Sequence, residues 1–294
     1  GQALLAAAAA SDALAAVGHD GRGSAALRAG VARARGEFVG PIHTARAICY
    51  QPYTPRPATG TAAPPREVNW ELWRGPANIA YRPELRGEGW LYEAALSPGE
   101  LGGAALEPLD AARWLLGGDE LPVGVHSSGG RFGDEVPGDT PNVQHAVFSM
   151  ADRRSLAVEI RGLVSPAEQG LRVGAIAYGA TGWLNQADGF KPHIGHDDKG
   201  SPPEDAQPAD IGGVSAPNAL ANFVAAIAAG RAADINCPLT AGVRTAQYIA
   251  LANIAYRLGR ALDFDPAAEK FLGATDADAL LARPRVARGF GLPA

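Results

Sequence analysis

Hydrophobic residues near the start of the chain recur at helical spacing. Residues 3–12 and 24–36 each predict a helix, and the arginines of the second helix lie on its polar side. Its apolar positions are Leu27, Val31 and Ala34. Between the helices, residues 14–17 predict a short strand and 18–23 a glycine-bearing turn. Helix, strand, turn and helix in this order are typical of the end of a parallel α/β unit.

From residue 42 onward, short apolar runs separated by Gly, Pro and Asp replace the helical spacing. The predicted strands are 42–50, 123–128, 143–150, 156–162, 174–178 and 181–185. Hairpin-like turns at 151–154 and 179–180 predict a meander, and therefore an antiparallel sheet. The C-terminal part predicts a polar surface loop at 196–217, helices at 219–229 and 240–262, and an irregular tail from residue 263.

One predicted helix, within residues 99–118, combines core and polar positions. Pro108 is tolerated only in the first turn of a helix, so the helix begins near residues 105–107, and Gly117 ends it. The residues spaced to face a core are Leu109, Ala112 and Leu116. Those on another face are Glu107, Asp110 and Trp114. The pattern alone leaves open whether this second face is an active-site wall or an ordinary solvated surface.

Composition and charge exclude several classes of protein. With 294 residues, 47% hydrophobic and 19% charged, the chain is globular. A net charge of −5 without a basic run argues against binding to nucleic acid. No apolar run is long enough to span a membrane, and the Ala-rich start lacks the basic residues of a signal peptide. The two cysteines, Cys49 and Cys237, are expected to be reduced and buried.

Candidate chemistry is sparse in the pattern itself. The turn at 18–23 carries Arg22 and can offer backbone N–H groups to a phosphate or nicotinamide. It is not a GxGxxG fingerprint, and the pattern alone favours a plain tight turn. Residues 193–198 hold two histidines and two aspartates in a loop rather than in a helical zinc motif, so we expect no metal. The remaining histidines are single and expected to be structural: His19, His43, His126 and His145.

Residues 251–266 closely resemble the end of the bacterial Gfo/Idh/MocA oxidoreductases, the family of glucose–fructose oxidoreductase and inositol dehydrogenase. The resemblance continues to residue 283 through Glu269, Phe271 and Gly273. Further segments that match in order are Gly18 with Arg22, 45–50, 73–76, 109–114, 129–132, 140–142 and 178–179. The resemblance therefore covers residues 1 to about 283.

This resemblance implies an α/β protein in two parts. Residues 1–38 would be the residual edge of an NAD(P)-binding Rossmann domain. Residues 39–294 would form the C-terminal α+β domain, a large, mainly antiparallel open sheet packed with helices that holds the substrate. Family members bind NAD or NADP and transfer hydride to or from sugars and cyclitols. They commonly form homo-oligomers through the open sheet face, and some are exported. The resemblance thus implies the cytoplasm, or the periplasm where an upstream signal exists.

The resemblance also assigns candidate roles to residues. Asp110 matches a family aspartate, whereas Glu107 stands where the family has histidine, as does Val243. Asp110 and Glu107 are the candidate catalytic residues, and Gly18 and Arg22 the candidate cofactor contacts. The candidate substrate contacts are Tyr53, Arg113 and Trp114.

Two functions follow as hypotheses. In the first, the chain is part of an NAD(P)-dependent sugar or cyclitol oxidoreductase. It is expected to be inactive by itself, because the resemblance starts after the family's glycine fingerprint and Glu-Lys-Pro motif. In the second, it is a non-catalytic homologue that binds a sugar or forms an oligomer.

Overall fold

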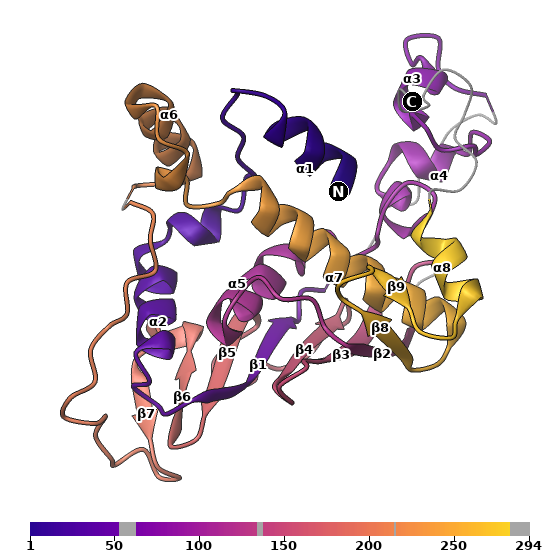
Figure 1. Ribbon diagram of the computed structural model, residues 1–294. Helices are drawn as coiled ribbons and strands as arrows, with labels where there is room; N and C mark the ends of the chain where they lie inside the picture. Colours follow the sequence, from indigo (N-terminus) through magenta and orange to yellow (C-terminus); the bar gives the residue numbers. More distant parts are fainter. Residues whose placement is uncertain (53–62, 134–137, 215, 283–294) are drawn as a thin grey trace.

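The computed structural model describes residues 1–52, 63–133, 138–214 and 216–282, which build one large sheet with helices on one of its faces (Figure 1). The strands are β1 (Ile42–Cys49), β2 (Gly124–Gly130), β3 (Val143–Ser149), β4 (Ser155–Arg161), β5 (Val173–Gly179), β6 (Gly182–Asn185), β7 (Pro192–Ile194), β8 (Leu262–Asp265) and β9 (Lys270–Phe271). Their order in the sheet is β7-β6-β5-β1-β4-β3-β2-β8-β9. The predicted fold class, a large and mainly antiparallel sheet with helices, is confirmed.

The predicted meander is right for two groups of strands and wrong at the centre of the sheet. Strands β2, β3 and β4 pair in antiparallel sequence, as do β5, β6 and β7. Strand β1 separates the two groups, antiparallel to β5 but parallel to β4. Because β1 lies far upstream in sequence, the local spacing of the later strands gave no sign that it would enter between them.

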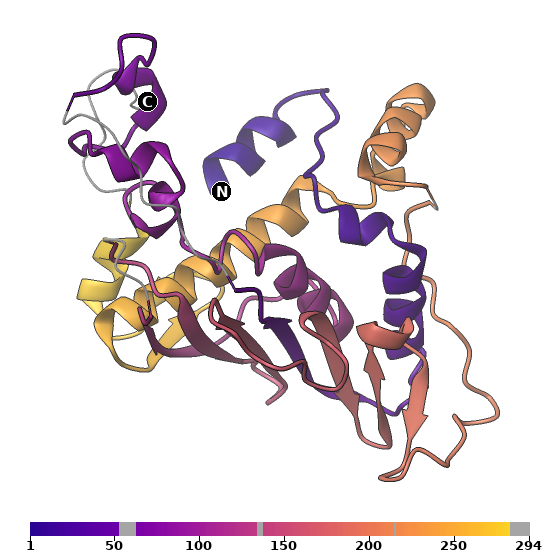
Figure 2. The same ribbon diagram turned by 180° about the vertical axis from the view of Figure 1, so that it is seen from behind.

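Side-chain alternation along the strands separates an inner from an outer face. In β3, Ala146 and Phe148 are buried beneath the helices, whereas His145 and Val147 lie on the outer face. The helices that cover the inner face are α2 (Ala25–Arg35), α5 (Leu106–Leu116) and α7 (Leu239–Leu258). The view from behind also shows the described helices on one face of the sheet only (Figure 2). The outer face is therefore the open one.

The central helix α5 forms as its sequence predicts. It begins at Leu106, with Pro108 in its first turn, and ends at Gly117, whose φ of 133° favours glycine. Its core face is buried, and so is its second predicted face except at Glu107, because α5 lies between the sheet below and α2 and α7 at its sides. The alternative of a solvated face is therefore wrong for Asp110 and Trp114, which are 1% and 5% exposed.

The N-terminal segment is less regular than its sequence predicts. Helix α1 ends at Ala9, and residues 14–17 form no strand. A single bridge joins Ala16 to Pro238, and Val17 N–H donates to the Cys237 carbonyl. No neighbouring strand is present there among the described residues, so the extended segment has nothing to continue pairing with.

The C-terminal tail corrects a second prediction. Instead of an irregular segment after residue 263, the chain adds the β8–β9 hairpin to the sheet and then forms helix α8 (Thr275–Leu281). The hairpin buries Phe264 against Phe271, with ring centroids 5.3 Å apart. The intervening Asp and Pro residues masked the strand pattern in the sequence.

The remaining elements are short or peripheral. They are α1 (Gln2–Ala9), η1 (Asp20–Gly23), α3 (Trp70–Arg74), α4 (Pro83–Arg86), η2 (Gly89–Tyr92), η3 (Gln186–Asp188), α6 (Ala219–Ala229) and η4 (Ala232–Asp234). Within the described part of the chain, no helix has the length and apolar character needed to cross a membrane.

Truncating the inner face of β3 tests the assignment of the two sheet faces. Phe148→Ala removes a fully buried ring that packs edge-on against Tyr248, so we expect it to lower the free energy of unfolding by about 3–5 kcal/mol. Val147→Ala, one residue away on the outer face, is the control and should cost less than about 1 kcal/mol. Urea unfolding followed by circular dichroism measures both values. Equal losses would contradict the assignment of faces.

Candidate functional site

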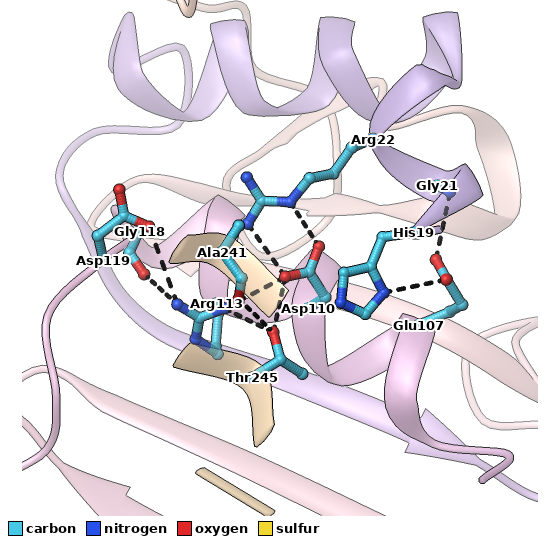
Figure 3. A network of polar contacts seen from close by, with 10 residues as sticks. All are labelled: His19, Gly21, Arg22, Glu107, Asp110, Arg113, Gly118, Asp119, Ala241 and Thr245. Carbon is cyan, nitrogen blue, oxygen red and sulfur yellow. Dashed lines mark hydrogen bonds and ion pairs between the residues drawn. The ribbon is translucent and has the colours of Figure 1, made fainter. Parts of the chain in front are cut away.

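A buried carboxylate, Asp110 on α5, is the centre of the polar network shown in Figure 3. Arg22 from η1 binds it with two hydrogen bonds, from Nε to Oδ2 at 2.7 Å and from Nη2 to Oδ1 at 3.0 Å. Thr245 from α7 donates its hydroxyl to Oδ1 at 2.8 Å. Three separate parts of the chain therefore converge on one carboxylate.

A second buried arginine, Arg113, completes the network one turn along α5. Its Nη1 lies 3.2 Å from Asp110 Oδ1 and donates to the Thr245 hydroxyl at 2.8 Å. Its Nη2 donates to the Gly118 carbonyl at 2.9 Å. Its guanidinium carbon also lies 5.1 Å from the ring centre of Tyr248. Arg113 is thus held by hydrogen bonds and an aromatic ring as well as by the charge of Asp110.

The electrostatics of Asp110 follow from these contacts. Burial by itself raises the pKa of Asp110, but the hydrogen bonds and charge of Arg22, aided by His19 and Arg113, hold that pKa below its usual value. Burial likewise lowers the pKa of Arg22, and Asp110 more than restores it. Asp110 is therefore ionised and saturated with donors, which suits a positioning role better than proton transfer.

The other candidate carboxylate, Glu107, lies one turn earlier on α5 and reaches the surface. Its side chain is 44% exposed. His19 Nδ1 lies 3.1 Å from Oε1, and the Gly21 N–H donates to Oε2 at 3.2 Å, so both carboxylate oxygens are held from the same turn. In Figure 3 the His19 ring lies between Glu107 and Asp110.

His19 and Thr245 are the site residues that sequence reasoning missed. His19, expected to be merely structural, is 1% exposed, and its Nε2 is buried without a hydrogen-bond partner among the described residues. Its position beside Gly18 in the glycine-bearing turn was the available signal. Thr245 lies within an apolar helix, where a threonine hydroxyl commonly bonds to a carbonyl of its own helix. Nothing in the neighbouring sequence indicated that this hydroxyl would also contact Asp110.

The remaining candidate residues occupy different surroundings. Trp114 is buried, with Arg22 stacked 4.8 Å from its ring centre, and so supports the ion pair. Gly18 is exposed, with open space where a side chain would project. Tyr53 lies outside the described residues.

The other polar groups noted in the sequence fall elsewhere in the fold. Cys49 and Cys237 are buried free thiols, as predicted, and burial raises the pKa of each to about 11. The candidate metal segment instead places His193 between Asp188 and Asp198. No group of three or more His, Cys, Asp or Glu side chains suited to hold a metal occurs in residues 1–52, 63–133, 138–214 and 216–282.

Comparison with known proteins relates the chain to others by structure. No protein-family model matches the sequence, and no curated protein matches it. The chain resembles the aldose–aldose oxidoreductase from Caulobacter crescentus, solved with glycerol, at 16% identity and a TM-score of 0.58. That match covers 90% of this chain and 68% of the other.

Two further solved structures share the fold at similar identity. The WlbA dehydrogenase from Bordetella pertussis, solved with NADH and UDP-GlcNAcA, matches at 14% identity and a TM-score of 0.53, over 85% of this chain and 64% of its own. A putative NADPH-dependent oxidoreductase from Desulfitobacterium hafniense matches at 13% identity and a TM-score of 0.53, over 84% and 63%. The chain thus spans about two thirds of these structures and has the fold of Gfo/Idh/MocA-type oxidoreductases.

Neutralising Asp110 tests its positioning role. Asp110→Asn leaves Arg22 and Arg113 buried without a counter-charge, so we expect the free energy of unfolding to fall by about 3–5 kcal/mol. Because the folded pKa of Asp110 is depressed, its contribution is present above the unfolded pKa of about 3.9 and is lost as pH falls through the folded pKa. Urea unfolding between pH 3 and 7 measures both effects.

The matched control is Asp119→Asn, whose 78% exposed carboxylate lies 3.9 Å from Arg113. It should change stability by less than about 1 kcal/mol. A similarly small loss in Asp110→Asn would contradict the role assigned to the buried pair.

Proposed function

We propose that this chain is part of a Gfo/Idh/MocA-type NAD(P)-dependent oxidoreductase that acts on a sugar or cyclitol. The observation that carries the proposal is the Glu107 carboxylate, which is held at both oxygens and accessible from the surface, on a fold shared with sugar oxidoreductases. Residues 1–38 would be the edge of the nucleotide-binding domain, and 39–294 the substrate domain.

Glu107 is the residue that meets the substrate. A carboxylate accepts hydrogen bonds from sugar hydroxyl groups, and one with fixed oxygens loses less entropy when it does so. The His19 and Gly21 contacts fix Glu107 in this way. In turnover Glu107 accepts the proton of the reacting hydroxyl group, the part that a neutral histidine would otherwise play.

Asp110 acts through its neighbours. It holds Arg22 in place, and Arg22 belongs to the same turn as His19 and Gly21, so the ion pair fixes the position of the turn that orients Glu107. Arg113 and Trp114 extend this support and reach the substrate only indirectly.

Nicotinamide chemistry would supply hydride exchange with the sugar carbon, but the two predicted cofactor contacts do not form a dinucleotide site by themselves. Arg22 is 5% exposed and its Nε and Nη2 are bound to Asp110, so it offers little charge to a phosphate. At Gly18 a side chain would meet no other residue within 4 Å, so this position provides room but no further contact for a ligand. We therefore expect this polypeptide alone to bind neither NADH nor NADPH tightly.

A second function, a non-catalytic sugar-binding or oligomer-forming homologue, is favoured by one observation. Asp110, which matches a family aspartate, is saturated by two arginines and a threonine. Binding without turnover needs only the positioned Glu107 and no proton-transfer group. The two functions therefore differ in turnover and agree in requiring Glu107 for affinity.

We also propose that the chain forms a homo-oligomer through the open face of the sheet. A small apolar cluster of Ile48, Tyr50, Leu171 and Ile176 lies on that face, apart from the main core. Val147 of β3 is exposed on the same face, at 45%. The cluster itself is buried, and the exposed Val147 with the uncovered strands around it would favour association with another copy.

Substitution of Glu107 tests the proposed substrate contact. Saturation-transfer NMR identifies a ligand of the purified chain among neutral aldoses and cyclitols. We expect Glu107→Gln to weaken its binding at least about tenfold, because a charge-assisted hydrogen bond contributes about 1.5–3 kcal/mol. Glu71→Gln, whose 81% exposed carboxylate lies on distant α3, is the control and should bind as the wild type does.

Turnover with NAD⁺ and NADP⁺ then separates the two functions. The oxidoreductase predicts turnover by the complete gene product that is lost in Glu107→Gln, whereas the binding homologue predicts none with either cofactor. Saturable enhancement of NADPH fluorescence by the chain described here would contradict the expected lack of cofactor binding.

A charge placed on the open sheet face tests the proposed oligomer. Val147→Glu should shift the molar mass measured by light scattering toward the monomer, because it buries an unpaired carboxylate in the interface. Val164→Glu, at a loop position that is 91% exposed, is the control and should leave the mass unchanged. A monomeric wild type, or a Val147→Glu variant of unchanged mass, would contradict the proposal.

A further inference from the structure

His193 on β7 is held by a carboxylate at each ring nitrogen. Nδ1 lies 2.7 Å from Asp198 Oδ2, and Nε2 lies 2.5 Å from Asp188 Oδ2. The imidazole also stacks on Trp183 of β6, with ring centres 5.0 Å apart and an angle of 5° between the planes. The ring is thus fixed on three sides, at the edge of the sheet farthest from β9.

This geometry requires the protonated ring. An ionised carboxylate only accepts hydrogen bonds, and a neutral imidazole has a single N–H to donate. Deprotonation would therefore leave one nitrogen lone pair facing a carboxylate oxygen at hydrogen-bond distance. One of the two contacts must then open.

The two aspartates belong to parts of the chain that are anchored differently. Asp188 ends η3, and the adjoining corner is tied to α2, where Arg33 donates to the Phe190 carbonyl at 2.9 Å and the Phe190 ring packs against Gly30. Asp198 instead lies in the first turn of the long segment 195–214, which has no helix or strand. His193 therefore joins a fixed corner to the start of that segment.

The far end of segment 195–214 is held by Ile211, which packs against the main core, and by Val214, which exchanges two hydrogen bonds with Asn236. Nearer Asp198, the contacts with the body of the protein are backbone hydrogen bonds. The Gly200 N–H donates to the Ile194 carbonyl at 3.1 Å, and the Ala209 N–H to the Ala32 carbonyl of α2 at 2.9 Å. Arg28 donates to the Gly212 carbonyl at 2.6 Å. The segment thus runs as a strap along α2, the helix that follows the turn carrying Arg22.

We propose that His193, hydrogen-bonded at both ring nitrogens, is a pH-dependent latch that fastens the 195–214 strap to the sheet edge. Loss of its proton frees the strap from Asp198 up to and including the Ala209 contact with α2. This proposal does not depend on the proposed oxidoreductase function. It assigns the strap a closed state in acid and an open state in base.

The direction of the pH dependence follows from the groups that face the ring. These are Asp188 from η3 and Asp198 from the strap. Tyr178 of β5 lines the same hollow, and the Asp197–Lys199 ion pair lies in the same turn of the strap. Burial lowers the pKa of His193, but the bonds to Asp198 and Asp188 outweigh it and raise the pKa above 6.5. The latch is therefore fully closed below about pH 6.5 and is lost as pH rises through the folded pKa.

Hydrogen exchange of the full chain between pH 5.5 and 8.5 tests the latch. After correction for intrinsic exchange, protection of the Gly200 and Ala209 amides should be constant at low pH. It should then fall by up to about tenfold for each pH unit, the limit for one linked proton. The Ile249 amide within α7 should not follow this dependence, and imidazole ¹⁵N shifts should show both nitrogens of His193 protonated at pH 6.

Two variants separate the latch from general loosening. His193→Gln should expose both amides at every pH, and Asp198→Asn, which keeps the ring, should move the transition to lower pH. His126→Gln, an exposed histidine on β2, is the control and should retain the wild-type profile. A flat wild-type profile, or a His193→Gln variant with the wild-type transition, would overturn the latch. A response of Gly200 without Ala209 would overturn its extension to α2.

Discussion

The buried ion pair between Arg22 and Asp110 constrains the arrangement around it more than any other polar contact described here. Two charges removed from water are tolerated only when each is paired and hydrogen-bonded. Asp110 meets this condition through donors from η1, α5 and α7, and Trp114 covers the guanidinium. The relative positions of these three elements are therefore fixed together, since displacement of any one leaves a buried charge unsatisfied.

This constraint explains why two carboxylates on one helix behave so differently. Asp110 and Glu107 lie three residues apart on α5, yet the first is buried beneath η1 and the second reaches solvent at the edge of η1. The same turn supplies Arg22 to one and His19 with Gly21 to the other. The ion pair thus fixes the position of η1, and η1 in turn orients the accessible carboxylate of Glu107. Positioning and substrate contact are separate tasks on the same helix.

The sequence predicted the local elements well and their partners poorly. Pro108 and Gly117 set the ends of α5 through backbone geometry, which depends on the residues themselves. The insertion of β1 beside β4, by contrast, is a pairing across more than a hundred residues, and its strand pattern is the same whichever neighbours it takes. The site shows the same division. Asp110 and Arg22 were noticed in the sequence pattern and received their roles from the resemblance. The partner of Glu107, His19, became visible only when η1 and α5 were placed side by side.

The same contacts bear on whether residues 1–38 form a separate unit. Leu27 and Val31 of α2 belong to the same buried core as Leu109 of α5, and Arg22 supplies the main counter-charge of Asp110. Without residues 1–38, Asp110 would keep only Arg113 and Thr245, and the side of α5 that packs against η1 and α2 would face water. The boundary near residue 38 corresponds to the junction between the two domains that the family resemblance implies. We nevertheless expect the segments on its two sides to fold together, because neither segment satisfies its buried charges alone.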